Sequence, residues 1–169
     1  TYNFEVTMIP AQDIASITVS STKIRNAIEA SDFEKVQQFL GRPFELNGKV
    51  TKGAGLGRTL GFPTANLFVK ETHKLIPPRG VYLVQAEHKG KLHSGMMNIG
   101  NRPTLNGDYQ TLEVHLFEFN QTLYDHNLRV FFLKKIRDEI KFNSLDELKA
   151  QLLKDQEICK RTITKSREK

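Results

Sequence analysis

Residues 81–99 read VYLVQAEHKGKLHSGMMNI, and this stretch decides the fold class. Two β-prone runs, residues 81–87 and 91–99, flank His88-Lys89-Gly90, a sequence typical of a tight turn. The pattern predicts a β-hairpin, whose two strands run antiparallel.

Two further stretches alternate apolar residues with residues of the opposite face, as strands do. Their apolar rows are Leu112, Val114, Leu116 and Leu128, Val130, Phe132. Gly, Asn and Pro turns join these short strands, and no crossover helices separate them, which disfavours a parallel Rossmann sheet. The sequence therefore predicts a mainly β fold: a small closed antiparallel Greek-key β-barrel.

Helical patterns precede this region. Residues 6–9 are compatible with a strand, and Ser20, Ser21 or Thr22 is expected to cap a short helix carrying Ile24, Ala27 and Ile28. Ser31 and Glu34 match a capping box for a second helix that Gly41 and Pro43 end. We expect a domain boundary between residues 42 and 43, with residues 43–169 forming the barrel domain.

The carboxyl-terminal part is predicted to be one amphipathic helix packed on the barrel. Ser144 and Glu147 form its capping box, and its apolar stripe contains Leu145, Leu148, Leu152 and Cys159. Cys159 is interpreted as a buried hydrophobic residue and not as a reactive thiol.

Composition limits the function classes. The 169 residues are 38% hydrophobic and 26% charged, without an apolar run long enough for a membrane helix and without a secretory signal pattern. A single cysteine excludes an intrachain disulfide and favours the cytoplasm. The net charge of +6 is compatible with nucleic acid, acidic membranes or phosphorylated small molecules. The missing initiator Met suggests a piece of a longer chain.

The segment 48–66, GKVTKGAGLGRTLGFPTAN, carries the most chemical information. Gly53, Gly55 and Gly57 leave backbone N–H groups free to cradle phosphate, with Lys52 and Arg58 supplying charge. A flexible hairpin loop is the alternative. The segment matches neither the P-loop nor the dinucleotide fingerprint.

Thr64 and Asn66 follow, two residues apart on an extended segment, so their oxygens project to the same side. A hydroxyl and an amide oxygen suit Mg²⁺ bridging nucleotide phosphates. A local turn after Pro63 explains the same residues without a ligand.

Several ordered motifs together resemble the riboflavin kinase (flavokinase) domain of bacterial bifunctional riboflavin kinase/FAD synthetases. They are segment 48–67 with its PTAN tetrad, Arg79-Gly80-Val81-Tyr82, Asn98-Ile99-Gly100, Arg102-Pro103-Thr104, Leu112-Glu113-Val114-His115 and the stretch 136–142. Upstream, Val19-Ser20-Ser21-Thr22-Lys23-Ile24-Arg25 is similar to the last motif of the adenylyltransferase domain in that family. Residues 1–42 would then be a remnant of that domain, a strand and two helices without their packing partners.

The resemblance implies roles for individual residues. ATP and its phosphates would be bound by Lys52, Gly53, Gly55, Gly57, Arg58, Thr64 and Asn66. Thr64 and Asn66 would also bind Mg²⁺, with Mn²⁺ as an alternative metal, and Glu113 would be the catalytic base. The flavin pocket would include Arg137, Phe142 and Leu145.

Simpler roles stay open for these residues. Glu113 on sequence pattern alone is a solvated strand residue, and Arg137 could instead pair with Asp138, Glu139 or another carboxylate. Phe142 and Leu145 could be ordinary core residues. His115 could orient Glu113, but an ordinary hydrogen-bonded histidine is favoured, and it is assigned no catalytic role. The stretch 101–110 is expected to be a loop, either a flap over the substrates or an idle turn.

The sequence thus predicts an ATP-dependent riboflavin 5′-phosphotransferase that makes FMN, with riboflavin and ATP as its partners. Neither nucleic acid, membrane nor protein partner is expected. The HxGH motif of the family's adenylyltransferase is absent from the 169 residues, so FAD synthesis is not expected. A catalytically silent flavin- or nucleotide-binding barrel is the main alternative, and an oligonucleotide-binding barrel is a third, which the absence of Trp disfavours.

Overall fold

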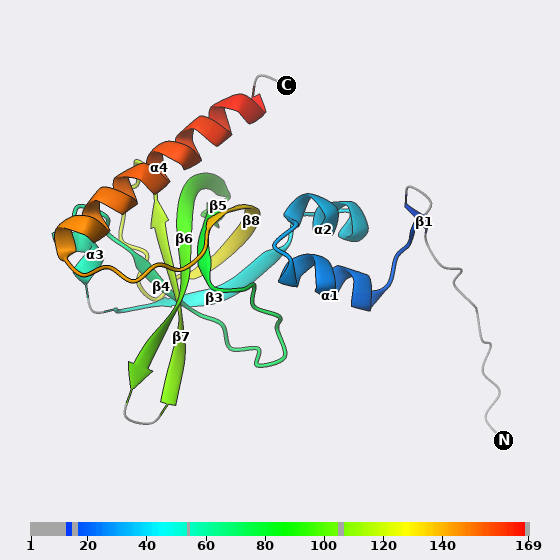
Figure 1. Ribbon diagram of the computed structural model, residues 1–169, viewed down its shortest axis with the longest axis horizontal. Coiled ribbons are helices and arrows are strands. Elements are labelled where there is room, and N and C mark those ends of the chain that lie inside the picture. The colour runs from blue at the N-terminus through cyan, green and yellow to red at the C-terminus, as the bar shows by residue number, and fades with distance from the viewer. Residues whose placement is uncertain (1–12, 15–16, 54, 105–106, 168–169) are drawn as a thin grey trace.

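The computed structural model describes residues 13–14, 17–53, 55–104 and 107–167. Its centre is a closed barrel with strand order β3-β4-β7-β6-β5-β8, in which all neighbours are antiparallel (Figure 1). The strands are β3 (Glu45–Thr51), β4 (Ala65–Phe68), β5 (Gly80–His88), β6 (Lys91–Thr104), β7 (Gly107–Leu116) and β8 (Asn127–Arg137). Because β8 returns to lie beside β5, the order β8-β5-β6-β7 is a Greek key, and the predicted fold is confirmed.

The β5–β6 hairpin has a two-residue turn. Lys89 and Gly90 have φ of 49° and 74°, as a type I′ turn requires. His88 pairs with Lys91 and is the last residue of β5, so placing His88 in the turn was wrong.

The stretch 101–110 continues strands β6 and β7, so its prediction as a loop was wrong. Backbone pairing runs from Gly95 opposite Leu116 out to Thr104 opposite Gly107. Figure 1 shows this hairpin projecting beyond the rest of the barrel. The tip, residues 105–106, lies outside the described residues.

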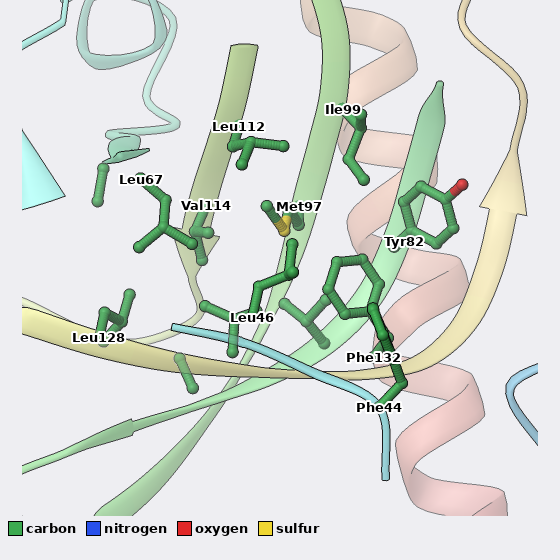
Figure 2. Close-up of a cluster of buried hydrophobic side chains, with 14 of the residues drawn as sticks. Phe44, Leu46, Leu67, Tyr82, Met97, Ile99, Leu112, Val114, Leu128 and Phe132 are labelled. Atoms are coloured by element: carbon green, nitrogen blue, oxygen red, sulfur yellow. The ribbon is translucent and has the colours of Figure 1, made fainter. Parts of the chain in front are cut away.

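The barrel interior is filled by one face of each strand. Both predicted apolar rows are buried, and they meet Leu46, Leu67 and Met97 from the facing strands (Figure 2). Glu113 and His115 therefore lie on the outer face of β7, as the alternation predicts.

Two short helices, α1 (Ser21–Glu29) and α2 (Phe33–Leu40), precede the barrel after a small β1–β2 hairpin (Asp13–Ile14, Ile17–Thr18). Ser20 caps α1, accepting a hydrogen bond from the Lys23 backbone N–H at 3.3 Å. Asp32 caps α2, accepting from the Lys35 N–H at 3.1 Å, so the predicted capping by Ser31 was wrong. Gly41 ends α2 with φ 68°, as predicted.

The helices share the hydrophobic core of the barrel. The Phe33 ring stacks on Phe132 at 5.3 Å between centroids and meets the edge of Tyr82 at 5.8 Å. Ala27, Ile28 and Val36 belong to the same buried cluster. The expectation that these helices lack packing partners was wrong. The domain boundary at residues 42 and 43 stays a prediction, and the strand expected at residues 6–9 lies outside the described residues.

Helix α4 (Leu145–Arg167) lies across the outside of the barrel (Figure 1). Ser144 accepts a hydrogen bond from the Glu147 N–H at 3.1 Å, and the Glu147 carboxylate accepts from the Asn143 N–H at 3.0 Å. Cys159 is buried, and burial, followed by the nearby Asp155, raises the pKa of its thiol to about 12, so the inert interpretation is confirmed. Among the described residues, no helix is long and apolar enough to span a membrane.

Candidate active site

Strands β4 and β7 bring the two predicted oxygen donors to the predicted base. Asn66 of β4 pairs with Glu113 of β7, and Thr64 lies just before β4. The Thr64 hydroxyl donates a hydrogen bond from Oγ1 to Glu113 Oε2 at 3.2 Å. All three side chains are half-buried. The three residues therefore form one polar centre on the outside of the barrel.

The glycine-rich segment lies directly against this centre. A Cβ at Gly53 would be 1.9 Å from Asn66 Nδ2, and a Cβ at Gly57 would be 2.3 Å from the Phe62 carbonyl oxygen and 3.3 Å from Thr64 Oγ1. Real Cβ atoms essentially never come within 3.0 Å of another atom. A side chain at Gly53 would therefore displace the Asn66 amide, and one at Gly57 would collide with the Phe62 backbone.

A four-residue helix, α3 (Leu56–Thr59), follows Gly55, which has φ 78°. This helix was not predicted, because the glycine pattern of the segment indicates a loop. Arg58 on α3 donates from Nη2 to the Tyr124 hydroxyl at 3.3 Å. Lys52 is exposed at the end of β3 and lines neither of the cavities described next.

A cavity of about 410 Å³ opens beside the polar centre, between α3, the outer face of the barrel and α4. Its lining includes Gly55, Gly57, Thr64, Asn66, Glu113, Arg137 and Phe142, all predicted site residues. The apolar part of the wall comes from Leu60, Phe62, Val81, Met96, Leu148 and Leu152. The volume is within the range of small-molecule sites, roughly 300–1,000 Å³.

Leu145 does not line this cavity and is 53% exposed, and its contact with the flavin stays a prediction. It is the first residue of α4, ahead of the turns that contact the barrel; Leu148 and Leu152 lie on those turns and do line the cavity. Sequence reasoning also missed the polar lining residues Asn98, Thr111 and Glu139. Asn98 and Glu139 lie inside the motifs that resemble the riboflavin kinase family, and this position could have indicated that they belong to the site.

A second cavity of about 280 Å³ lies on the other side of Thr64. Arg58, Pro63, Phe119 and Tyr124 line it, and Thr64 is the residue that both cavities share. The polar centre therefore stands at the boundary between two cavities of different character.

Arg137 is both a cavity residue and half of an ion pair. Its Nε donates to both Asp155 carboxylate oxygens at 3.0 Å, and its Nη2 donates to Oδ2 at 2.8 Å. Its guanidinium also lies over the Phe142 ring, 5.8 Å from the centroid. The carboxylate that pairs with Arg137 is therefore Asp155 of α4, and neither Asp138 nor Glu139, the two candidates named from the sequence.

His115 supports the turn before Thr64. Its Nδ1–H donates to the Pro63 carbonyl oxygen at 2.8 Å, and its ring meets Phe62 edge-on at 5.3 Å. Burial lowers the pKa of His115 below its usual value of 6.5. A neutral, hydrogen-bonded strand histidine is the alternative favoured from the sequence, and it is confirmed.

The polar centre fits a hard divalent cation. The Thr64 hydroxyl, the Asn66 amide and the Glu113 carboxylate offer oxygen donors, the type that Mg²⁺ and Mn²⁺ prefer. Within the described ranges no group of three His, Cys, Asp or Glu is placed to hold a metal ion. A metal at this centre would therefore keep waters and use oxygens of its ligand, as Mg²⁺ does with nucleotides.

The chain is similar to known proteins over most of its length. A model of the riboflavin kinase family (Flavokinase) matches residues 40–163. The bifunctional riboflavin kinase/FMN adenylyltransferase of Haemophilus influenzae is 46% identical over 144 residues, covering 84% of this chain and 46% of the relative. The protein of the same name from Escherichia coli K12 is 41% identical, covering 92% and 49%. The chain spans about half the length of the curated relatives it matches.

Solved structures give the same fold. One described as a macrolide-efflux protein from Streptococcus pneumoniae has a TM-score of 0.82 at 36% identity, covering 90% of this chain and 50% of that one. Riboflavin kinase from Trypanosoma brucei has a TM-score of 0.51 at 22% identity, covering 73% and 81%. With the family match extending over most of its length, the chain belongs to the riboflavin kinase family.

Proposed function

We propose that this chain transfers the γ-phosphoryl group of ATP to the 5′-hydroxyl of riboflavin, giving FMN and ADP. The observation that carries the proposal is the contact between Thr64 and Glu113 at the boundary of two cavities. Phosphoryl transfer needs the acceptor and the nucleotide to approach one point from opposite sides, because the attacking and leaving oxygens lie in line.

Glu113 is proposed as the general base. As the riboflavin 5′-oxygen forms its bond to the γ-phosphorus, the bond from that phosphorus to the β,γ-bridging oxygen breaks, and the hydroxyl proton goes to the Glu113 carboxylate. Thr64 now donates to one carboxylate oxygen, which leaves the other free for the substrate. A positioned base contributes typically ~10²–10⁴ in rate.

The flavin ring is assigned to the larger cavity. Phe142 and Arg137 form one wall and the side chains of α4 another, which suits a flat, largely apolar ring. Asn98, Thr111 and Glu139 supply polar groups beside Glu113, where the hydroxyl-bearing ribityl chain would lie.

ATP is assigned to the second cavity and to the glycine-rich segment. Phe119 and Tyr124 offer aromatic surface for the base, and Arg58 of the same cavity offers positive charge for the phosphates. Lys52 is outside the cavity and would have to reach the phosphates from the exposed start of the glycine-rich segment. Gly53 packs against Asn66 and Gly57 against Thr64, and these two polar residues would hold Mg²⁺ or Mn²⁺, while Gly55 offers a further backbone N–H of the same segment to the phosphates. The metal would neutralise charge that develops on the transferred phosphoryl group.

We further propose that the chain acts in the cytoplasm on these two small molecules, without nucleic acid, membrane or a protein partner. The single cysteine agrees with a reducing compartment. We propose FMN as the final product, since the 169 residues contain no HxGH motif.

The test is incubation of the purified chain with riboflavin, ATP and Mg²⁺, followed by chromatographic separation of riboflavin, FMN and FAD. FMN is expected, with no FAD. Glu113→Gln is expected to lose ~10²–10⁴ in turnover while still binding riboflavin. Glu118→Gln is the matched control, because Glu118 is an exposed carboxylate that lines neither cavity and pairs with the exposed Lys160 at 3.5 Å. Riboflavin binding without ADP release in the unaltered chain would establish the silent-binder alternative and overturn the proposal.

A further inference from the structure

The connection between β8 and α4, residues 138–144, has no regular secondary structure, yet it forms one wall of the larger cavity. Glu139, Ile140 and Phe142 of this connection line the cavity. Figure 1 shows the connection running from the end of β8 to the first turn of α4. A wall without a helix or strand of its own needs side chains elsewhere to hold it.

Asp155 is the buried anchor of this wall. Its side chain is fully buried in α4, and it lines neither cavity. It accepts from Arg137 Nε and Nη2 at 2.8–3.0 Å and from Gln151 Nε2 at 2.8 Å. These contacts fix the plane of the Arg137 guanidinium, because a bidentate pair restricts orientation as well as distance.

The fixed guanidinium in turn holds the connection at two points. Arg137 Nη1 donates to the Asp138 carbonyl oxygen at 2.9 Å, and the Phe142 ring lies against the guanidinium at 5.8 Å. The other polar ties of the connection are exposed: Lys135 to Asp138 at 2.6 Å, the Asn101 N–H to Glu139 at 3.3 Å, and Asn143 and Ser144 to Glu147 at 3.0 and 3.1 Å. Exposed ties of this kind contribute little to holding a geometry.

We propose that Asp155 is a positioning residue for the flavin, which sets the shape of the larger cavity through Arg137 and the connection 138–144. This inference rests on the proposed function, since it takes riboflavin as the ligand of that cavity. Asp155 touches neither substrate, so its loss should weaken riboflavin binding while the polar centre and the nucleotide side are preserved.

The test compares Asp155→Asn with Glu157→Gln, which removes an exposed partner of Arg161 on the same helix (2.6 Å). For Asp155→Asn, the riboflavin KM and the riboflavin Kd measured without ATP are each expected to rise about tenfold, because a cavity wall that is no longer held in place has to be ordered when riboflavin binds. The KM for ATP and the kcat at saturating riboflavin should stay within about twofold. Glu157→Gln should change none of them.

A purely structural role predicts a different result, in which the melting temperature falls and the riboflavin Kd of the folded protein is unchanged, and that overturns the inference. If Asp155→Asn does not fold, Gln151→Ala replaces it, since this change removes the other hydrogen bond to Asp155. The riboflavin Kd is then expected to rise about threefold with the other constants unchanged, and an unchanged riboflavin Kd would contradict the inference. Riboflavin binding by the unaltered chain without FMN formation would instead sink the proposed function and leave the Kd comparison intact. No riboflavin binding by the unaltered chain would overturn both.

Discussion

An alanine methyl group at Gly53 would fall 1.9 Å from Asn66 Nδ2 and 2.7 Å from Asn66 Cγ. Gly53 does not have a positive φ, so alanine there carries no left-handed strain. Ordinary contact begins at 3.4 Å, so the Asn66 amide has to move by the difference between 3.4 and 1.9 Å, which is about 1.5 Å. The backbone keeps its place, because the obstructing atoms belong to a side chain.

A displacement of about 1 Å at a reacting centre costs on the order of 10²-fold in rate, or about 2.7 kcal/mol in the barrier. Gly53→Ala is therefore expected to lower kcat/KM for ATP at saturating riboflavin by at least ~10²-fold. The riboflavin Kd, followed by flavin fluorescence, and the melting temperature should change little. FMN formation, resolved by chromatography, supplies the rates.

The cause is tested with a double-mutant cycle. Asn66→Ala should lose about as much as Gly53→Ala, and the double variant should lose no more than Asn66→Ala alone, because both changes remove the same interaction. A Gly53→Ala enzyme within about threefold of the unaltered rate would refute the reasoning. A double variant whose loss in kcat/KM equals the product of the two single losses would refute the reasoning as well.

Three further outcomes are expected. The free energy of unfolding should decrease as pH falls below about 6.5, because burial lowers the pKa of both His115 and His88 and the unfolded chain then binds protons that the folded chain does not. Each histidine contributes at most about 1.4 kcal/mol per pH unit between its unfolded and folded pKa. Urea titrations at several pH values would measure this, and His115→Gln should show a flatter dependence on pH. Phe33→Ala should destabilise the barrel by about 3–5 kcal/mol in urea denaturation, whereas a loss below 1 kcal/mol would mean that the helices do not belong to its core. Chelation of divalent metal should abolish FMN formation with the riboflavin Kd within about threefold, and undiminished turnover in chelator would exclude a metal at Thr64 and Asn66.

The barrel was predictable because strand alternation and turn chemistry are local signals. Leu112 and Leu128 begin rows whose period of two fixes which face is buried, and burial of those rows closes the sheet. The projecting part of β6 and β7 gave no such signal, because backbone pairing between Asn101 and Gln110 holds it. The α2 cap was ambiguous because Ser31 and Asp32 are adjacent and both are good capping residues; a φ of 58° at Ser31 puts Asp32 at the cap.

The site was predictable as a set of residue types, but its spatial arrangement was not. The spacing of Thr64 and Asn66 predicts that they share a side, whereas their meeting with Glu113 depends on the register of β4 against β7. The position of Asp155 in the sequence also indicates that it is buried, although no role was predicted for it. Leu148, Leu152 and Cys159 form the apolar stripe of α4, and Asp155 occupies the same stripe one turn after Leu152. An acid on such a stripe indicates a buried partner.

Among the described residues, Thr64 alone lines both cavities, so its side chain borders the space assigned to each reactant. In the proposed function, riboflavin and ATP would therefore both be bound, one on each side of Thr64, when the phosphoryl group is transferred. Initial-rate plots should therefore show intersecting lines, the pattern of a ternary complex, whichever reactant binds first.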